Sequence, residues 1–327
     1  MNGNKIVRNF IWRFLERSGV QITTFITSII LARLLSPEDY GKIAIVTVFI
    51  TILNIFVDSG FGSALIQKKS ADDLDYSSVF FVNMGMCIGL YFFLYCTAPL
   101  IAKFYSDSTL ISMIRAIGIT LVISGVKNVQ MAYVSKNMMF KKFFYSTLVG
   151  TMASTIIGIY MAYKGYGAWA LIVQSVSNNF IDTLILWLTV SWKPKFIFSI
   201  TRVKNLFSFG WKLLFISLIN SIYDNLRSLI IGKRYTASDL AFYSKGSNWP
   251  SLLTSNINSA ITSVLFPAMS ELQENLEGLK VMTRRAISVS SYVISPLLLG
   301  LSATGEGMVS LIFGEKWLPC VFFMRIF

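Results

Sequence analysis

Long apolar runs follow one another along this sequence with only short polar breaks between them. An α-helix needs roughly 20 mostly apolar residues to cross the hydrocarbon core of a bilayer. Because backbone polar groups find no partners in lipid, helix is the conformation that such runs adopt. The sequence therefore predicts an all-α polytopic membrane protein. Its runs cover about 14–35, 37–60, 78–101, 110–132, 143–163, 167–190, 207–231, 237–264 and 284–303, and a tenth begins near 318.

The composition excludes several classes of function. Hydrophobic residues make up 54% of the chain and charged residues only 14%, against about 25% charged residues in a typical globular domain. The net charge of +13 comes from small basic groups between the runs, which is typical of membrane topology and not of a nucleic-acid-binding face. The chain has no histidine, and its three cysteines do not have metal-ligand spacing. We expect no metal, no cofactor and no enzymatic activity.

The basic residues also predict an orientation. The N-terminal segment and alternate connections carry 16 Lys and Arg residues, whereas the opposite side carries 8. Because cytoplasmic loops are enriched in Lys and Arg, the N-terminus is predicted to be cytoplasmic.

The segment "ARLLSPEDYG" (32–41) reads as a tight external turn between two helices. Ser36 can cap the second helix, Pro37 suits the first turn, and Asp39 completes a capping box. The segment "TASD" (236–239) repeats this pattern 200 residues later.

The repeat extends into the helices that follow. A polar stripe at 47, 51, 54 and 58 lies on one helix face and recurs at 247, 251, 254 and 258. Six helices fit between the copies, so both copies have the same orientation and the halves are parallel repeats. We therefore predict a first lobe of helices 1–6 at 1–195, and a second lobe at 196–327 that is incomplete with helices 7–10.

Polar faces on four of these helices suggest a central cavity. Polar groups that face lipid without partners cost several kcal/mol, on the order of 2–7 each, so these faces should meet water, substrate or another helix. Asp224 and Arg227 are three residues apart and could instead neutralise each other, and basic residues near helix ends could be set by topology alone. The excess of cations suggests an anionic substrate. The candidate substrate-binding residues are Arg13, Arg17, Arg33, Lys212 and Arg227, and the candidate ion-coupling residues are Asp58 and Asp224.

Several segments resemble the Wzx-type polysaccharide flippases of the multidrug, oligosaccharidyl-lipid and polysaccharide exporter superfamily. They include "ILARLLSPEDYGKIAI" (30–45), "VDSGFGSALIQKK" (57–69), "GYGAWAL" (165–171), "LIIGKRYTASDLAFYSKG" (229–246) and "LIFGEKW" (311–317). The resemblance covers essentially the whole chain and is nearest to the colanic-acid and lipopolysaccharide exporters.

This resemblance implies a bacterial inner-membrane protein that moves an undecaprenyl-diphosphate-linked oligosaccharide to the periplasmic leaflet by alternating access. Its expected partners are that lipid-linked substrate, membrane lipids and the polysaccharide polymerase or other assembly proteins. No Walker-type nucleotide-binding motif occurs, so coupling to an ion gradient is expected. Because family members commonly have twelve or more helices, we expect these 327 residues to be a C-terminally truncated flippase.

Two other functions remain open from the sequence. One is an ion-coupled exporter of small solutes from the same superfamily, which the basic character of the proposed cavity disfavours. The other is a membrane component of polysaccharide assembly that transports nothing. A membrane glycosyltransferase would need a large extramembrane loop, and the connections here are short.

Overall fold

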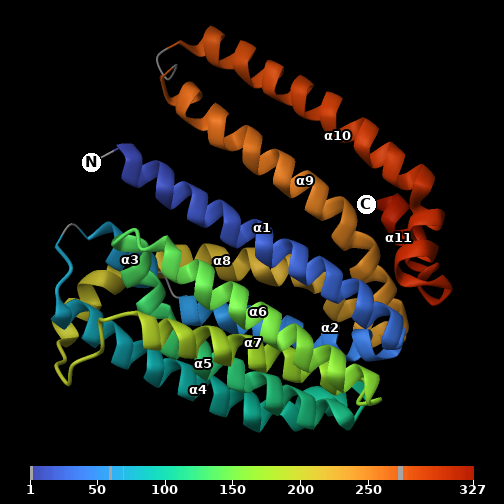
Figure 1. Ribbon diagram of the computed structural model, residues 1–327, viewed down its shortest axis with the longest axis horizontal. Helices are drawn as coiled ribbons and strands as arrows, with labels where there is room; N and C mark the ends of the chain where they lie inside the picture. Colours follow the sequence, from blue (N-terminus) through green and yellow to red (C-terminus); the bar gives the residue numbers. More distant parts are fainter. Residues whose placement is uncertain (1–2, 59–60, 69, 272–274) are drawn as a thin grey trace. The chain divides into compact units, whose positions relative to one another are not determined.

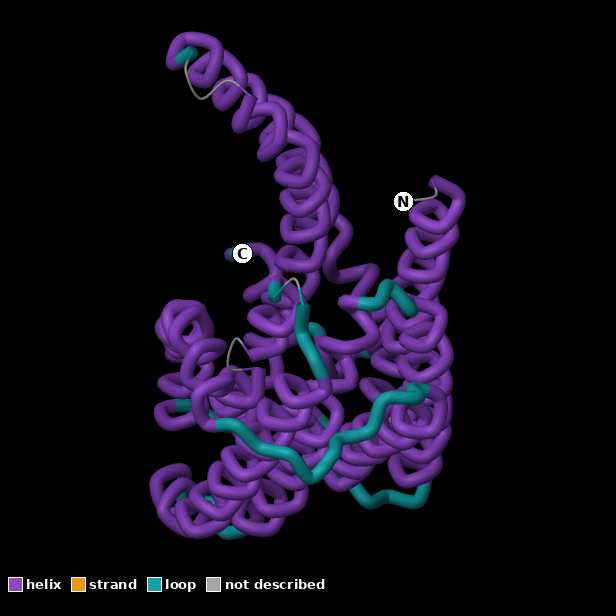
Figure 2. Tube along the Cα trace, turned by 90° about the vertical axis from the view of Figure 1, so that its left-hand side faces the viewer, coloured by secondary structure: helices purple, strands orange, loops and turns teal. Residues whose placement is uncertain are grey.

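A computed structural model describes residues 3–58, 61–68, 70–271 and 275–327 (Figure 1). Within these ranges the chain is helical almost throughout and contains no strand, as Figure 2 shows. It forms two compact units, Met1–Ala237 and Ser238–Phe327. The first contains α1 (Gly3–Leu34), α2 (Pro37–Asp58), α3 (Phe61–Gln67), α4 (Asp73–Tyr105), α5 (Thr109–Lys136), α6 (Phe140–Tyr163), α7 (Ala168–Thr189) and α8 (Ile200–Arg234). The second contains nearly all of α9 (Ala237–Glu271), α10 (Leu276–Phe313), the 3₁₀ helix η1 (Glu315–Trp317) and α11 (Cys320–Ile326).

The predicted multi-pass membrane protein is confirmed. Among the described residues, seven helical segments are long and apolar enough to cross a membrane. Helices α1 and α9, which the sequence predicts to be spans, are also long but are not among the seven. Their polar stripes reduce their hydropathy. The seven segments are Pro37–Gln67, Asp73–Tyr105, Thr109–Lys136, Phe140–Tyr163, Ala168–Thr189, Trp211–Arg234 and Leu276–Phe313.

The repeat at an offset of 200 residues appears in the helix boundaries. Helix α1 ends at Leu34 and α8 ends at Arg234, while α2 begins at Pro37 and α9 begins at Ala237. At the first of these turns the backbone N–H of Asp39 donates to Ser36 Oγ at 3.2 Å, and the N–H of Ser36 donates to Asp39 Oδ2 at 3.1 Å. This reciprocal pair confirms the predicted capping box.

Asp39 also connects two turns of the first unit. Its Oδ1 accepts a hydrogen bond from the backbone N–H of Ala168 at 2.9 Å, at the first residue of α7. One carboxylate therefore accepts hydrogen bonds from N–H groups at the starts of two helices. These bonds fix the turn between α1 and α2 against the start of α7.

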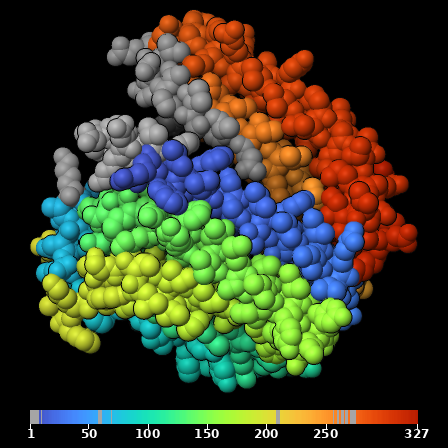
Figure 3. Space-filling model, viewed as in Figure 1, coloured from blue at the N-terminus to red at the C-terminus, as the bar shows by residue number. Residues whose placement is uncertain are grey.

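Small and polar residues let α1 pack closely on α6. A Cβ placed on Gly19 would lie 3.1 Å from Leu148 Cδ1, and the hydroxyls of Thr27 and Thr155 are 2.8 Å apart. Close backbone approach and interhelical hydrogen bonds are the usual means of helix association in a membrane. Figure 3 shows α1, in blue, lying beside α6, in green.

An aromatic core near the start of α4 holds α3, α4, α5 and the segment after α7 together. The ring centre of Tyr76 lies 5.4 Å from that of Tyr133 and 5.5 Å from that of Trp192. Tyr76 and Trp192 belong to one buried cluster, and Tyr133 packs against it. Leu206 of α8 is part of the same cluster, so the beginning of α8 is anchored in the first unit.

The second unit has an aromatic core of its own. Trp249 of α9 lies 5.8 Å from Phe313 at the end of α10, and Phe242 lies 6.0 Å from Trp317. Gly246 permits close approach, because an added Cβ would lie 2.4 Å from the carbonyl oxygen of Cys320 in α11.

Candidate functional site

The polar face of α1 carries two candidate arginines with different surroundings. Arg13 is bound to its own neighbours: its guanidinium pairs with Glu16 at 2.5 Å and lies 5.3 Å from the ring centre of Phe143. Glu16 in turn accepts a hydrogen bond from Thr147 of α6 at 3.4 Å. Arg17, one turn further along, is exposed and makes no ion pair with any residue that the structure describes.

The middle of α8 is exposed and carries polar residues on one face. The segment Trp211–Arg234 has the length and hydropathy of a span, and its most apolar window contains no buried residue. Lys212, Asp224 and Arg227 are all exposed on it. Within the described ranges Asp224 makes no ion pair. Ser217 and Asn220 are exposed on the same face, which is therefore polar over several turns.

The two faces are positioned by different neighbours. Helix α1 packs on α6, whereas α8 packs on α2, α3 and α4. The ends of α8 are fixed by Phe207, whose ring centre lies 5.7 Å from that of Phe61, and by Leu229, whose carbonyl accepts from Tyr105 Oη at 3.4 Å. The exposed middle is thus held along the first unit from both ends.

Two other candidates lie at helix ends. Arg33 is exposed in the last turn of α1, where a cation complements the helix dipole. Asp58 is the last residue of α2, and its side chain lies outside the described part of the structure.

A buried ion pair inside the first unit joins two residues that the sequence did not place together. Lys127 Nζ of α5 lies 3.0 Å from Asp182 Oδ2 of α7. The ammonium of Lys127 donates to this carboxylate, so the pair joins two helices of the first unit. The two residues are 55 positions apart, so no local pattern could have identified the pair.

Residues 190–199 connect α7 to α8 and form the long teal stretch across the helix ends in Figure 2. A second cluster of side chains holds this linker, and we call the cluster the linker clasp. It is centred on Asp75, whose side chain is 0% exposed. Its carboxylate lies 2.5 Å from Lys68 Nζ and 3.6 Å from Arg202 Nη1, the latter too long for a hydrogen bond. The clasp consists of Lys68, Asp72, Asp73, Asp75, Ser77, Ser78, Trp192, Lys195, Ser199 and Arg202.

The clasp holds both backbone and side chains of the linker. The hydroxyls of Ser77 and Ser78 accept from the backbone N–H groups of Lys195 and Ser199, at 3.0 and 2.9 Å. Asp72 and Asp75 form a capping box for α4, and the N–H of Asp75 donates to the Asp72 carboxylate and so lowers its pKa. The box explains why α4 begins at Asp73, earlier than the predicted 78, and the D-x-x-D spacing was a signal that sequence reasoning missed.

Membrane-length helices in this arrangement define a class of protein. The fold is similar to that of two solved membrane proteins. It matches the lipid II flippase MurJ in an inward closed conformation with a TM-score of 0.68 and 14% identity, over 98% of this chain and 71% of that one. It also matches an inward-facing multidrug resistance MATE family transporter, with a TM-score of 0.68 and 15% identity, over 96% and 79%.

Within that class, the chain belongs to the family described as polysaccharide biosynthesis protein, which it matches over residues 30–322. It is 25% identical to the succinoglycan biosynthesis transport protein ExoT of Rhizobium meliloti (strain 1021), over 97% of this chain and 64% of that protein. It is 25% identical to the lipopolysaccharide biosynthesis protein WzxC of Escherichia coli (strain K12), over 88% and 59%. The chain therefore spans about 60% of the length of these relatives.

Proposed function

We propose that the protein to which this chain belongs moves an undecaprenyl-diphosphate-linked oligosaccharide from the cytoplasmic to the periplasmic leaflet of a bacterial inner membrane. In this role it delivers the precursor for the synthesis of surface polysaccharide. It works by alternating access of its two lobes. The family and the transport proteins among its relatives support this role.

One observation supports the substrate assignment: exposed cations lie on helices of membrane length. Contact of these charges with the hydrocarbon of the bilayer would cost free energy. Arg17 on α1 and Lys212 and Arg227 on α8 are exposed. Charged side chains within a span are stable when they face a water-filled path or bind a charged ligand. A diphosphate is such a ligand, since the planar guanidinium donates two hydrogen bonds at once to phosphate oxygens.

We further propose distinct roles for the remaining candidates. Arg33 extends the cationic path toward the external end of α1. Asp58 and Asp224 are the carboxylates that couple transport to an ion gradient. Arg13 acts by fixing α1 on α6 through Glu16, because its guanidinium is already engaged there.

The experiment changes Arg17 in the chromosomal gene of the host cell. Arg17→Ala should reduce surface polysaccharide strongly and cause the lipid-linked precursor to accumulate, while the protein level stays near normal. Arg17→Lys should restore part of the export, since it keeps a point charge but loses the planar fork. Surface polysaccharide and precursor are measured by gel staining and by mass spectrometry of extracted lipids.

A matched control is Lys141→Ala, which removes a nearby cation that lies 5.5 Å from the ring centre of Trp12. It should leave export unchanged. Normal export by Arg17→Ala would refute the assignment of Arg17 and favour a topological role for it.

A further inference from the structure

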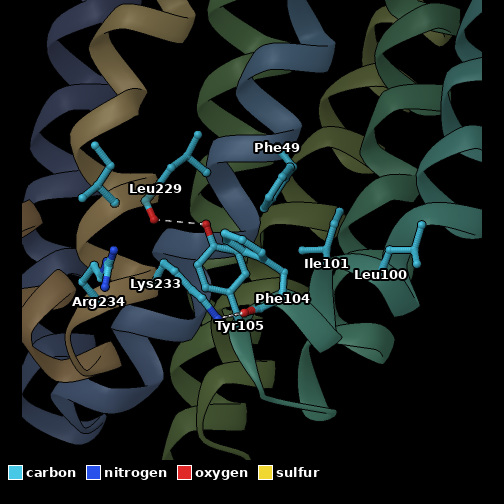
Figure 4. Close-up of a pocket in the computed structure, with 9 residues that line it drawn as sticks. Phe49, Leu100, Ile101, Phe104, Tyr105, Leu229, Lys233 and Arg234 are labelled. Atoms are coloured by element: carbon cyan, nitrogen blue, oxygen red, sulfur yellow. Dashed lines mark hydrogen bonds between the residues drawn. The ribbon is translucent and has the colours of Figure 1, made fainter.

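A pocket on the first unit lies apart from the proposed substrate faces. It has a volume of about 820 Å³ and is formed by α2, the end of α4 and the end of α8 (Figure 4). Pockets of roughly 300–1,000 Å³ hold ligands of the size of drugs and cofactors. The lining is Phe49, Leu100, Ile101, Phe104, Tyr105, Leu229, Ile230, Lys233 and Arg234.

The pocket is apolar except at one end. Leu100 is 68% exposed and Phe104 is 54% exposed, so large hydrophobic surfaces stand open there. In Figure 4, Lys233 and Arg234 stand on α8 on one side, and Leu100 and Ile101 stand on α4 on the other. A ligand that fits this arrangement is amphiphilic, with a hydrocarbon part between the helices and a negative charge at the end of α8.

The two cations have no acidic partner among the described residues. Lys233 Nζ donates to the backbone carbonyl of Phe104 and lies 4.6 Å from the centre of its ring. An ammonium has three N–H donors, so the contact with Phe104 leaves donors for a ligand. Arg234 contributes a second positive charge beside it. This excess of charge selects an anionic headgroup over a neutral one.

The position along the helices identifies the source of that ligand. Lys233 and Arg234 are in the last turn of α8, and Tyr105 is the last residue of α4, so the charged end of the pocket coincides with the ends of two spans. Lipid headgroups lie at that depth, and tyrosine is enriched there. Ile101 and Phe49 lie further into the spans, at the depth of the acyl chains.

We propose that this pocket binds one anionic phospholipid of the surrounding bilayer, with its phosphate on Lys233 and Arg234 and an acyl chain between α4 and α8. The bound lipid fills the space between the ends of these helices and so stabilises the packing of α8 on α4. The site depends on membrane insertion and does not require the proposed transport function.

The test equilibrates the purified 327-residue protein with equal amounts of phosphatidylglycerol and phosphatidylcholine and counts retained lipids by native mass spectrometry. The wild-type protein should retain one phosphatidylglycerol in preference to phosphatidylcholine. In the variant Lys233→Gln/Arg234→Gln the preference for phosphatidylglycerol should fall by about 10- to 30-fold. This factor corresponds to the loss of about 1 kcal/mol for each cation near the lipid surface. Ile101→Trp, which fills the pocket and keeps both charges, should also lose the retained lipid.

Lys164→Gln is the matched control, because Lys164 follows the end of α6 near the ring of Tyr160 but lines no part of the pocket. It should retain phosphatidylglycerol as the wild type does. Unchanged lipid preference in either the double variant or Ile101→Trp would overturn the proposal. Displacement of the lipid by soluble glycerol phosphate at the same concentration would also overturn it, since the pocket would then be a phosphate site without acyl recognition.

Discussion

The ion pair between Lys127 and Asp182 is expected to stabilise the first unit in a way that a double-mutant cycle can measure. The two charged atoms are 3.0 Å apart, and the side chains are only 16% and 11% exposed. Lys127→Met leaves the carboxylate of Asp182 buried among membrane helices without its counter-charge. Asp182→Asn leaves the ammonium in the same position.

Removing one partner of a buried ion pair costs about 3–5 kcal/mol, because the remaining charge stays desolvated. Because both side chains keep some exposure, we expect each single variant to lower the free energy of unfolding by about 3 kcal/mol. The double variant Lys127→Met/Asp182→Asn removes both charges, so it should be less destabilised than the sum of the single variants by about 2 kcal/mol or more. Each variant is purified in detergent, and its free energy of unfolding is measured by denaturant titration with circular dichroism.

A matched control is Lys142→Met. Among the described residues Lys142 Nζ donates to the backbone carbonyl oxygen of Thr189 at 2.7 Å and to no carboxylate, so its removal leaves no unpaired charge. It should cost about 1 kcal/mol or less. Strictly additive effects of Lys127→Met and Asp182→Asn would contradict the account of a coupled buried pair.

Three further predictions concern the ends of the helices. Asp75→Asn should release the linker clasp and speed tryptic cleavage at Lys195 several-fold. Because the pKa of Asp72 is lowered, protection of the wild type against trypsin should persist at neutral pH. Protection against pepsin should be lost as the pH falls below the unfolded pKa of about 4. Asp39→Ala should destabilise the protein by about 1–2 kcal/mol, because the capping box of α2 loses its carboxylate and the N–H of Ala168 loses its acceptor. Thermal unfolding measures this loss, and a change within about 0.3 kcal/mol would contradict the double role of this carboxylate. Glu38→Cys should react with an impermeant maleimide in right-side-out inner-membrane vesicles, and labelling only after permeabilisation would reverse the proposed orientation.

The sequence predicts the parts of this fold that depend on local chemistry. The Ser36–Asp39 box was predictable because two residues of one turn carry the whole interaction. The ends of α1 and α8 were predictable because the same turn recurs 200 residues later. Helix α3 was not predicted, since a helix of 7 residues is too short for an apolar period to stand out.

Contacts between distant helices could not be predicted in the same way. The pocket joins Phe49, Ile101 and Lys233 from three helices, and each residue alone is an ordinary member of its span. Arg13 shows the same limit for the candidate site. Its position on the polar face of α1 suggested a ligand, whereas its actual partner is Glu16, which is in turn bonded to α6.

The central claim is that the polar face of α8 lines a path for the substrate, and cysteine labelling tests it most directly. In host cells that carry a variant without Cys87, Cys96 and Cys320, a cysteine is placed at Asn220 on the polar face or at Ile222 on the opposite face. We expect a water-soluble maleimide to label Asn220→Cys but not Ile222→Cys, and we expect accumulation of lipid-linked precursor to protect Asn220→Cys. Equal labelling of the two positions, or labelling of Asn220→Cys that the precursor does not change, would contradict the proposed path.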